Sequence, residues 1–309
     1  MSSKLLSGLQ LEEFKQNGFT IIKGILNNLE CEKFDQQVVQ PALRQYSGID
    51  QSDENTWNTD ILKEMATGEY SDEKPDILPG VMVRQQDGSD PISDKDSLNM
   101  TALHPILDQL HCRNNSDSLD WEWLHKNVGW IHVRFPIGHD KTSEVNTWHV
   151  DGGHYTPHFL DSPEQSVIIL PMIRPVGKGG GNTMILKKSH LYMAQKLQEA
   201  GKDGIPKEVT QNLNSIGKMW PKDLIVEAAP CDAGDVLLMH PFVVHSAGVA
   251  MNGHPLRIAF NMGVRWRRKP YINDNTDDLS HPDSDKHLSF LEKSISWSLK
   301  QSIDFVTNK

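Results

Sequence analysis

The stretch Thr147-Trp148-His149-Val150-Asp151 lies among short β-prone runs and carries two metal-ligand residue types. In an extended strand, residues i and i+2 point to the same face, so His149 and Asp151 are expected side by side. One imidazole and one carboxylate form two legs of a 2-His-1-carboxylate triad, which leaves three positions open on Fe(II). The spacing alone has low specificity, because the chain has 14 histidines and a second His-x-Asp occurs at 281–283, in a polar run with no β pattern.

A third ligand is expected on a late strand. His245 follows His149 by 96 residues, in the run 235–248 (DVLLMHPFVVHSAG), and Arg257 opens the next β-prone run. An arginine can hold a carboxylate through two parallel hydrogen bonds, as the far carboxylate of a metal-bound 2-oxo acid requires. The alternatives are a buried, hydrogen-bonded polar cluster for the three ligands and a structural ion pair for Arg257. Arg265, farther along the same strand, is the competing cation.

The β-prone runs are separated by Gly, Pro, Asn and Asp, which predicts a sandwich or barrel rather than alternating βαβ units. The runs are 19–22, 128–135, 147–151, 166–176, 182–186, 224–227, 235–239, 243–245 and 257–266. Helices are expected over 11–17, 28–46, 189–200, 206–216 and 287–303. Gly18 is expected to end the first helix, and Asn27 or Asn28 to cap the second. The fold class is therefore mostly β with helical cover.

We expect a single domain over 1–309, because one large β-rich domain can use this length. Residues 1–127 are expected to form a helical and loop N-terminal cover. Residues 128–268 form the β core with inserted helices, and 269–309 a C-terminal tail and helix. The polar stretch 48–97 is either a lid over the site or solvated surface loop, and the loop is favoured for its first part.

Composition limits the partners. Lys plus Arg number 31 against 41 Asp plus Glu, which gives a net charge of −10 and a pI near 5.7. This charge argues against non-specific nucleic-acid binding and against docking on an anionic membrane. No run of 18 apolar residues and no secretory leader is visible, and the three cysteines are far apart. We therefore expect a cytoplasmic enzyme with a small-molecule substrate, and leave its oligomeric state open.

The order of these motifs resembles a known family. His149-Val150-Asp151 is followed by 180–190 (GGNTMILKKSH), 234–240 (GDVLLMH), His245 and Arg257, and the opening 11–22 (LEEFKQNGFTII) also fits. Together they resemble the phytanoyl-CoA dioxygenase-like (PhyH) family over residues 10–268. The stretch 158–165 (HFLDSPEQ) resembles a small-molecule biosynthetic branch of that family.

The resemblance implies a double-stranded β-helix (a jelly roll, cupin-like) and an Fe(II)/2-oxoglutarate-dependent oxygenase. His149, Asp151 and His245 would bind Fe(II) as the catalytic triad, and Arg257 would bind the distal carboxylate of 2-oxoglutarate. O2 and 2-oxoglutarate would give succinate and CO2 while a substrate C–H bond is oxidised. The chain departs from the family where Lys187-Lys188-Ser189-His190 replaces Pro-Gly-Ser-His, which puts the turn geometry in doubt. Asp151 argues against halogenation, because halogenating relatives have a small residue there.

Further polar residues are candidates for secondary roles. Thr183 and Arg134 are candidates for co-substrate contacts, and His132 shares a strand face with Arg134. His154, His132 and Arg265 are candidates for substrate contacts. The alternatives are an exterior salt bridge for Arg134, a surface or turn position for His154 and a solvated strand end for Arg265.

Two other histidines are not expected to bind the metal. His158 is not expected to bind the metal because the triad is already complete, and His240 has the opposite strand parity to His245.

The sequence favours hydroxylation of a small carboxylate-bearing metabolite, for example one derived from an amino acid. A second reading keeps the iron but gives desaturation or oxidative cyclisation of a natural-product precursor, because the outcome depends on substrate placement within about an ångström. A third reading is a non-catalytic metal- or ligand-binding β-helix module. The mass of the product separates the first two readings, since one adds an oxygen and the other removes two hydrogens.

Overall fold

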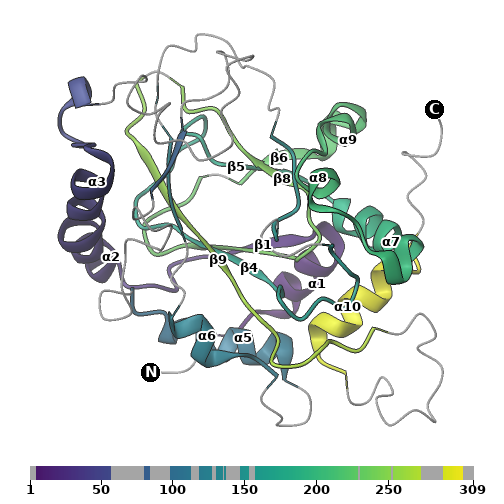
Figure 1. The fold of residues 1–309 in the computed structure, drawn as a ribbon. Coiled ribbons are helices and arrows are strands. Elements are labelled where there is room, and N and C mark those ends of the chain that lie inside the picture. Colours follow the sequence, from purple (N-terminus) through teal and green to yellow (C-terminus); the bar gives the residue numbers. More distant parts are fainter. Residues whose placement is uncertain are drawn as a thin grey trace.

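The computed structural model holds two antiparallel β-sheets with helices around them (Figure 1). It describes residues 5–56, 80–83, 98–112, 118–126, 130–134, 136, 147–152, 157–228, 230–251, 253–272 and 288–301. The larger sheet has the strand order β1 (Phe19–Ile22), β7 (Val236–Met239), β4 (Ile168–Pro171), β9 (Arg257–Gly263), β3 (Trp130–Arg134) and β2 (Gly80–Val83). The smaller sheet has the order β6 (Ile225–Glu227), β5 (Thr183–Leu186) and β8 (His245–Ala247).

The helices lie mainly along the outside of the larger sheet and at one end of the smaller one (Figure 1). They are α1 (Gly8–Asn17), α2 (Asn28–Phe34), α3 (Gln40–Ser47), α5 (His104–His111), α6 (Trp121–Lys126), α7 (Ser189–Ala200), α8 (Lys207–Thr210), α9 (Asn214–Met219) and α10 (Phe290–Ser298). A five-residue π-helical segment, Asp35–Val39, joins α2 to α3. Among the described residues, no helix is both long and apolar enough to cross a membrane.

Alternating residues of the central strands enter two different hydrophobic cores. Ile168 and Leu237 of the larger sheet pack with Ile185 of the smaller sheet, and this side of both sheets is called the interior here. Their neighbours Ile169 and Leu238 face the other way, into the larger core that the helices complete. This period of two is the one expected of sheets buried on both faces.

Local capping sets the ends of the first helix. Ser7 and Gln10 form a capping box at its start, and Gly18 ends it in the left-handed conformation with φ 87°. A Cβ at Gly18 would lie 2.6 Å from Nδ1 of His190, so glycine is required there by packing as well as by conformation. Asn27 caps α2 by accepting hydrogen bonds from the backbone of Leu29 and Glu30.

Most predicted elements are confirmed, and the first helix, the first strand and the helix over 189–200 lie where expected. The predicted strand over 147–151 is wrong, because this stretch makes only one bridge, between His149 and His245. The predicted helix over 206–216 is broken into α8 and α9. The strand over 166–176 is confirmed only at β4, and the helix over 28–46 contains the π-helical segment. The stretches 57–79 and 84–97 lie outside the described residues, so the lid prediction is not addressed.

Candidate metal centre

The loop that carries His149 and Asp151 is held by hydrogen bonds on both sides. On one side His149 and His245 exchange backbone hydrogen bonds of 3.0 Å, which attaches the loop to β8. On the other side the loop backbone bonds to the segment 210–214, through Val150 N to Thr210 O (2.9 Å) and Leu213 N to Trp148 O (2.8 Å). These backbone bonds explain why 206–216 is not one helix, because Thr210 O and Leu213 N bond to the loop and not to helix partners.

Side chains complete this attachment. Gln211 donates through Nε2 to the carbonyl of Val150 (2.7 Å), and Asn214 accepts from the backbone of Trp148 (3.1 Å). His158 donates through Nε2 to the carbonyl of Asp151 (3.1 Å) and accepts at Nδ1 from the hydroxyl of Thr210 (3.2 Å). His158 is thus a support of the loop, which agrees with its predicted exclusion from the metal ligands.

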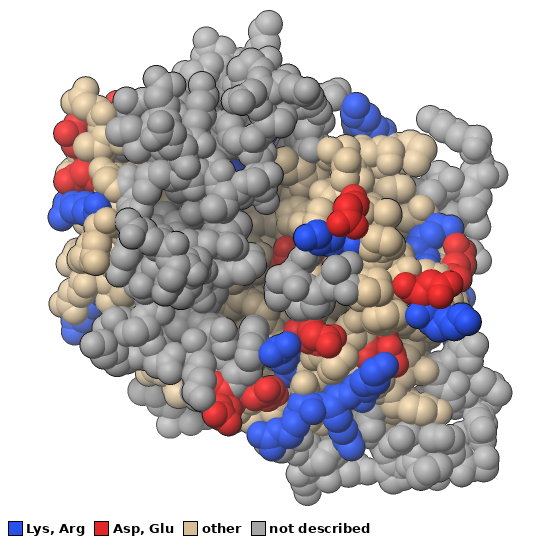
Figure 2. Space-filling model, in the orientation of Figure 1, with Lys and Arg blue, Asp and Glu red and all other residues tan. Residues whose placement is uncertain are grey.

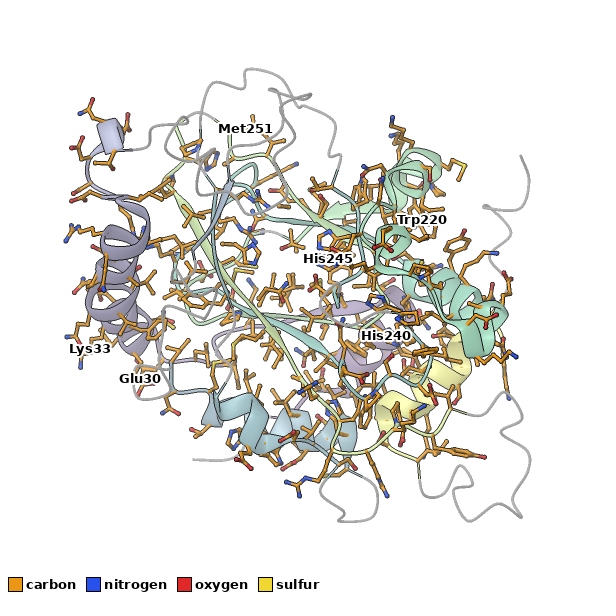
Figure 3. The ribbon with its side chains drawn as sticks, viewed as in Figure 1. Glu30, Lys33, Trp220, His240, His245 and Met251 are labelled. Atoms are coloured by element: carbon orange, nitrogen blue, oxygen red, sulfur yellow. The ribbon has the colours of Figure 1, made fainter. Side chains whose placement is uncertain are left out.

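The predicted triad converges. His149 Nε2 lies 3.2 Å and His245 Nε2 lies 3.6 Å from Oδ1 of Asp151, and one ligand atom from each residue falls within 4.8 Å of the others. Two ligands at right angles on a metal about 2.1 Å away lie about 3 Å apart. The spacing of the three atoms therefore fits one face of an octahedral ion. Figure 3 shows His245 pointing into the space between the two sheets.

Both histidines are oriented for ligation by Nε2. The Nδ1 atom of His149 donates to the carbonyl of Thr147 (2.7 Å), and that of His245 to the carbonyl of Val243 (3.2 Å). A proton on Nδ1 leaves a lone pair on Nε2, the atom that faces Asp151. The tautomers therefore match what a divalent metal requires of imidazole.

The carboxylate of Asp151 has a different contact at each oxygen. Oδ1 faces the two histidines, and Oδ2 accepts a 2.7 Å hydrogen bond from Nδ2 of Asn261 on β9. Burial alone would raise the pKa of Asp151, but the adjacent His245 and His149 hold that pKa well below its usual value. The carboxylate is thus ionised and ready to bind a cation at neutral pH.

Arg257 lies in the interior with little exposed surface. It is 5% exposed, and its Nη2 donates to the hydroxyl of Thr183 across the two sheets (3.1 Å), while its Nε has no hydrogen-bond partner. Burial, together with the nearby charge of Arg134, lowers the pKa of Arg257 to about 10, so it remains a cation at neutral pH. A buried guanidinium in this state favours the arrival of an anion.

His132 and Arg134 face the same interior. They pair directly opposite Ala259 and Arg257 in the β3–β9 ladder, so the shared face predicted for them is the inner one. Burial, with Arg134 as the next contribution, lowers the pKa of His132 to about 3, which makes it neutral at physiological pH. Its Nε2 is buried and has no hydrogen-bond partner.

The remaining histidines and arginine named from the sequence are His154, Arg265 and His240. His154 lies outside the described residues. Arg265 follows the end of β9, where its carbonyl accepts from the backbone of Asp120 (3.1 Å). His240 packs against His190 and Phe14, away from the interior (Figure 3).

In the view of Figure 2, the described basic side chains gather at the lower centre, with acidic side chains beside them. In the basic cluster 265–269, Lys269 is paired with Asp161 at 3.1 Å.

Sequence reasoning missed two features of the site. Asn261 is one, although its even spacing from Arg257 on a predicted strand places both side chains on one face, which was an available signal. The support of the loop by Thr210, Gln211 and Asn214 is the other, and no local pattern indicates it because the partners are about 60 residues apart.

Comparison with known proteins identifies one family. The model of the family described as Phytanoyl-CoA dioxygenase (PhyH) matches residues 14–259. No curated protein matches the chain. Among solved structures, the non-haem α-ketoglutarate-dependent carbocyclase SnoK from nogalamycin biosynthesis is 15% identical, with a TM-score of 0.45 over 92% of this chain and 94% of that one. The epimerase SnoN from the same biosynthesis is 17% identical, with a TM-score of 0.43 over 83% and 82%.

Proposed function

The chain belongs to the phytanoyl-CoA dioxygenase (PhyH) family, and from that premise we propose that it hydroxylates an unactivated C–H bond of a small, carboxylate-bearing metabolite. It is an Fe(II)- and 2-oxoglutarate-dependent oxygenase, with O2 as the oxidant. In the proposed reaction 2-oxoglutarate and O2 are converted to succinate and CO2, and one oxygen atom enters the substrate.

One observation carries the proposal. A three-residue ligand set of the type that binds Fe(II) with three positions open lies in the same interior as a buried arginine. His149, Asp151 and His245 would hold the iron, which when bound supplies the activation of O2. Arg257 would hold the distal carboxylate of 2-oxoglutarate through its fork of N–H groups.

The surrounding residues would orient the organic ligands. Thr183 already accepts from Arg257, which restricts the guanidinium to one orientation for the co-substrate. His132 is neutral and has a buried, unpartnered Nε2, so it can make a hydrogen bond to an incoming ligand without adding charge. Arg134 adds a second cation opposite Arg257 in the β3–β9 ladder. Cations on the inner face favour an anionic substrate, which supports the carboxylate-bearing class.

The fold proposal follows from the same arrangement. We infer that the larger and smaller sheets are the two halves of a double-stranded β-helix, with 128–268 as its core, β1 and β2 as strands added to the larger sheet, and the rest of 1–309 as cover. The antiparallel pairings and the Arg257–Thr183 bond between the sheets support this. His154 and Arg265 remain candidates for substrate contacts.

The test is an anaerobic titration of the apo-protein with Fe(II) and then 2-oxoglutarate, followed by the visible charge-transfer band of the complex. We expect His149→Ala to abolish the band and Arg257→Ala to require far more 2-oxoglutarate. His254→Ala and Arg267→Ala are matched controls that change the same residue types away from the triad. Absence of the band in metal-loaded wild type would refute the proposal.

The type of oxidation is tested by the product. Hydroxylation adds the mass of one oxygen to the substrate, whereas desaturation or ring closure removes the mass of two hydrogens. A screen of small carboxylates, read by mass spectrometry and by succinate release, decides between these outcomes.

A further inference from the structure

Asn261 is a polar residue in the middle of a strand whose neighbours are buried and apolar. It lies on β9 between Phe260 and Met262, which are 1% and 3% exposed. Asparagine is depleted in strands, and a polar side chain inside a protein costs free energy unless it is hydrogen-bonded. The side chain faces the interior, where its Nδ2 donates to Oδ2 of Asp151 at 2.7 Å.

This hydrogen bond distinguishes the two oxygens of the carboxylate. Oδ2 is held by Asn261, while Oδ1 lies 3.2 Å and 3.6 Å from the Nε2 atoms of His149 and His245. An ion bound by the two imidazoles therefore meets one oxygen of Asp151 and not both. Without the amide, the carboxylate can rotate so that both oxygens bind the ion, or turn away from it.

We propose that Asn261 is a positioning residue that holds Asp151 as a one-oxygen metal ligand. The inference rests on the proposed function, since it concerns the same metal site. Its consequence is that three coordination positions stay open for 2-oxoglutarate and O2, whereas a chelating carboxylate would occupy one of them. Hydrogen-bonded partners of metal ligands typically change metal affinity 10- to 100-fold when removed.

The placement of Asn261 also links two parts of the site. Arg257 lies four residues away on the same face of β9, so one strand carries the proposed co-substrate cation and the group that orients the metal ligand. The residue between them on that face, Ala259, is small and buried.

The experiment compares Co(II) binding to wild type and to Asn261→Leu, which removes the donor at similar volume. Co(II) is used because it is stable in air and its visible absorption reports its coordination. We expect the dissociation constant for Co(II) to rise 10- to 100-fold and the absorption spectrum to change in shape. Asn261→Gln, which keeps the amide on a longer side chain, is expected to bind more tightly than Asn261→Leu.

The matched control is Asn182→Leu. Asn182 is a buried asparagine whose amide donates at 2.7 Å to the carbonyl of Gly177 and at 3.1 Å to Glu227, not to the triad. It is expected to lower the melting temperature but to change Co(II) affinity less than threefold. If Asn261→Leu does not fold, Asn261→Ala replaces it.

The outcomes separate this inference from the proposed function. Wild type that binds no Co(II) overturns both. Wild type that binds Co(II), with Asn261→Leu or its replacement binding within threefold and with an unchanged spectrum, overturns the role of Asn261 alone.

Discussion

Replacing Arg257 with methionine is expected to weaken 2-oxoglutarate binding while stabilising the apo-protein. Methionine has a similar length and no charge, so it fills the space of the arginine stem. The two effects have opposite signs because a buried cation destabilises the apo-protein, whereas the same cation binds the carboxylate of 2-oxoglutarate when the ligand is present. A residue that only stabilised the fold would give losses in both measurements.

The loss of ligand affinity follows from an unpaired carboxylate. Breaking a buried ion pair by removing one partner costs about 3–5 kcal/mol. Because 1.4 kcal/mol corresponds to a factor of ten, the dissociation constant for 2-oxoglutarate should rise roughly 100- to 4,000-fold.

The gain in apo-protein stability follows from the pKa of Arg257. Burial, with the charge of Arg134, lowers that pKa from 12.5 to about 10, so the protonated form is disfavoured on folding by about 3 kcal/mol. This cost applies at every pH below about 10, where the residue is charged in the folded state. The lost hydrogen bond to Thr183 offsets about 1 kcal/mol. The net gain of about 1–2 kcal/mol should raise the melting temperature by about 2–4 °C.

Calorimetry of the apo-protein and anaerobic titration of the Fe(II) form measure the two effects. Arg267→Met, at an exposed position, is the control and should change neither. A melting temperature lowered by several degrees together with unchanged 2-oxoglutarate affinity would refute the reasoning, because Arg257 would then be a structural residue.

Three further predictions concern stability. Burial lowers the pKa of His190 to about 4, so its neutral form stabilises the fold above pH 6.5 and its own share of the stability lost by pH 5 should be about 2 kcal/mol, as the difference between wild type and His190→Gln in urea unfolding at pH 7.5 and pH 5 would show. Asp35→Ala should cost about 2–3 kcal/mol in urea unfolding, because it leaves Arg174, 2.6 Å away and 23% exposed, without its carboxylate. Gly217→Ala would place a Cβ 2.2 Å from Trp148, so it should cost about 1–3 kcal/mol and weaken Fe(II) binding in the folded protein.

Each of these predictions has a contradicting result. His190→Gln should reduce the loss between the two pH values, and an equal loss in that variant would refute the histidine argument. For Asp35→Ala, the reference is Glu199→Ala, which leaves Lys196, a 42% exposed cation, without its carboxylate and should cost less. For Gly217→Ala, unchanged stability and Fe(II) affinity would show that Trp148 moves aside without disturbing the metal loop.

The metal ligands could be predicted from sequence because their signals are local and chemical. His149 and Asp151 are two residues apart, and His245 and Arg257 stand at recognisable places in β-prone runs. The structure brings the three ligands together. The predicted strand over 147–151 is wrong, however, because His149 and Asp151 lie in a loop. An extended loop orients side chains in the same alternating way as a strand. The spacing of two residues therefore still places His149 and Asp151 on the same side.

The supports of the site could not be predicted in the same way. The break between α8 and α9 depends on hydrogen bonds between Trp148 and the segment 210–214, and helical periodicity contains no information on such distant partners. Asn261 was passed over because the apolar pattern of its strand identified a strand and nothing more.

The loop 147–151, which carries two of the metal ligands, is held in place by hydrogen bonds to 210–214. The affinity for iron therefore depends on how often 210–214 is folded and bound to this loop. Only molecules in which the loop is docked present the complete ligand set, so the observed dissociation constant is the intrinsic one divided by the docked fraction. By thermodynamic reciprocity, a bound ion must slow amide hydrogen exchange in α8 and α9, far along the chain from its own ligands. Substitutions at Gln211 or Asn214, which donate to or accept from the loop backbone, can therefore tune iron loading while the three ligands stay the same.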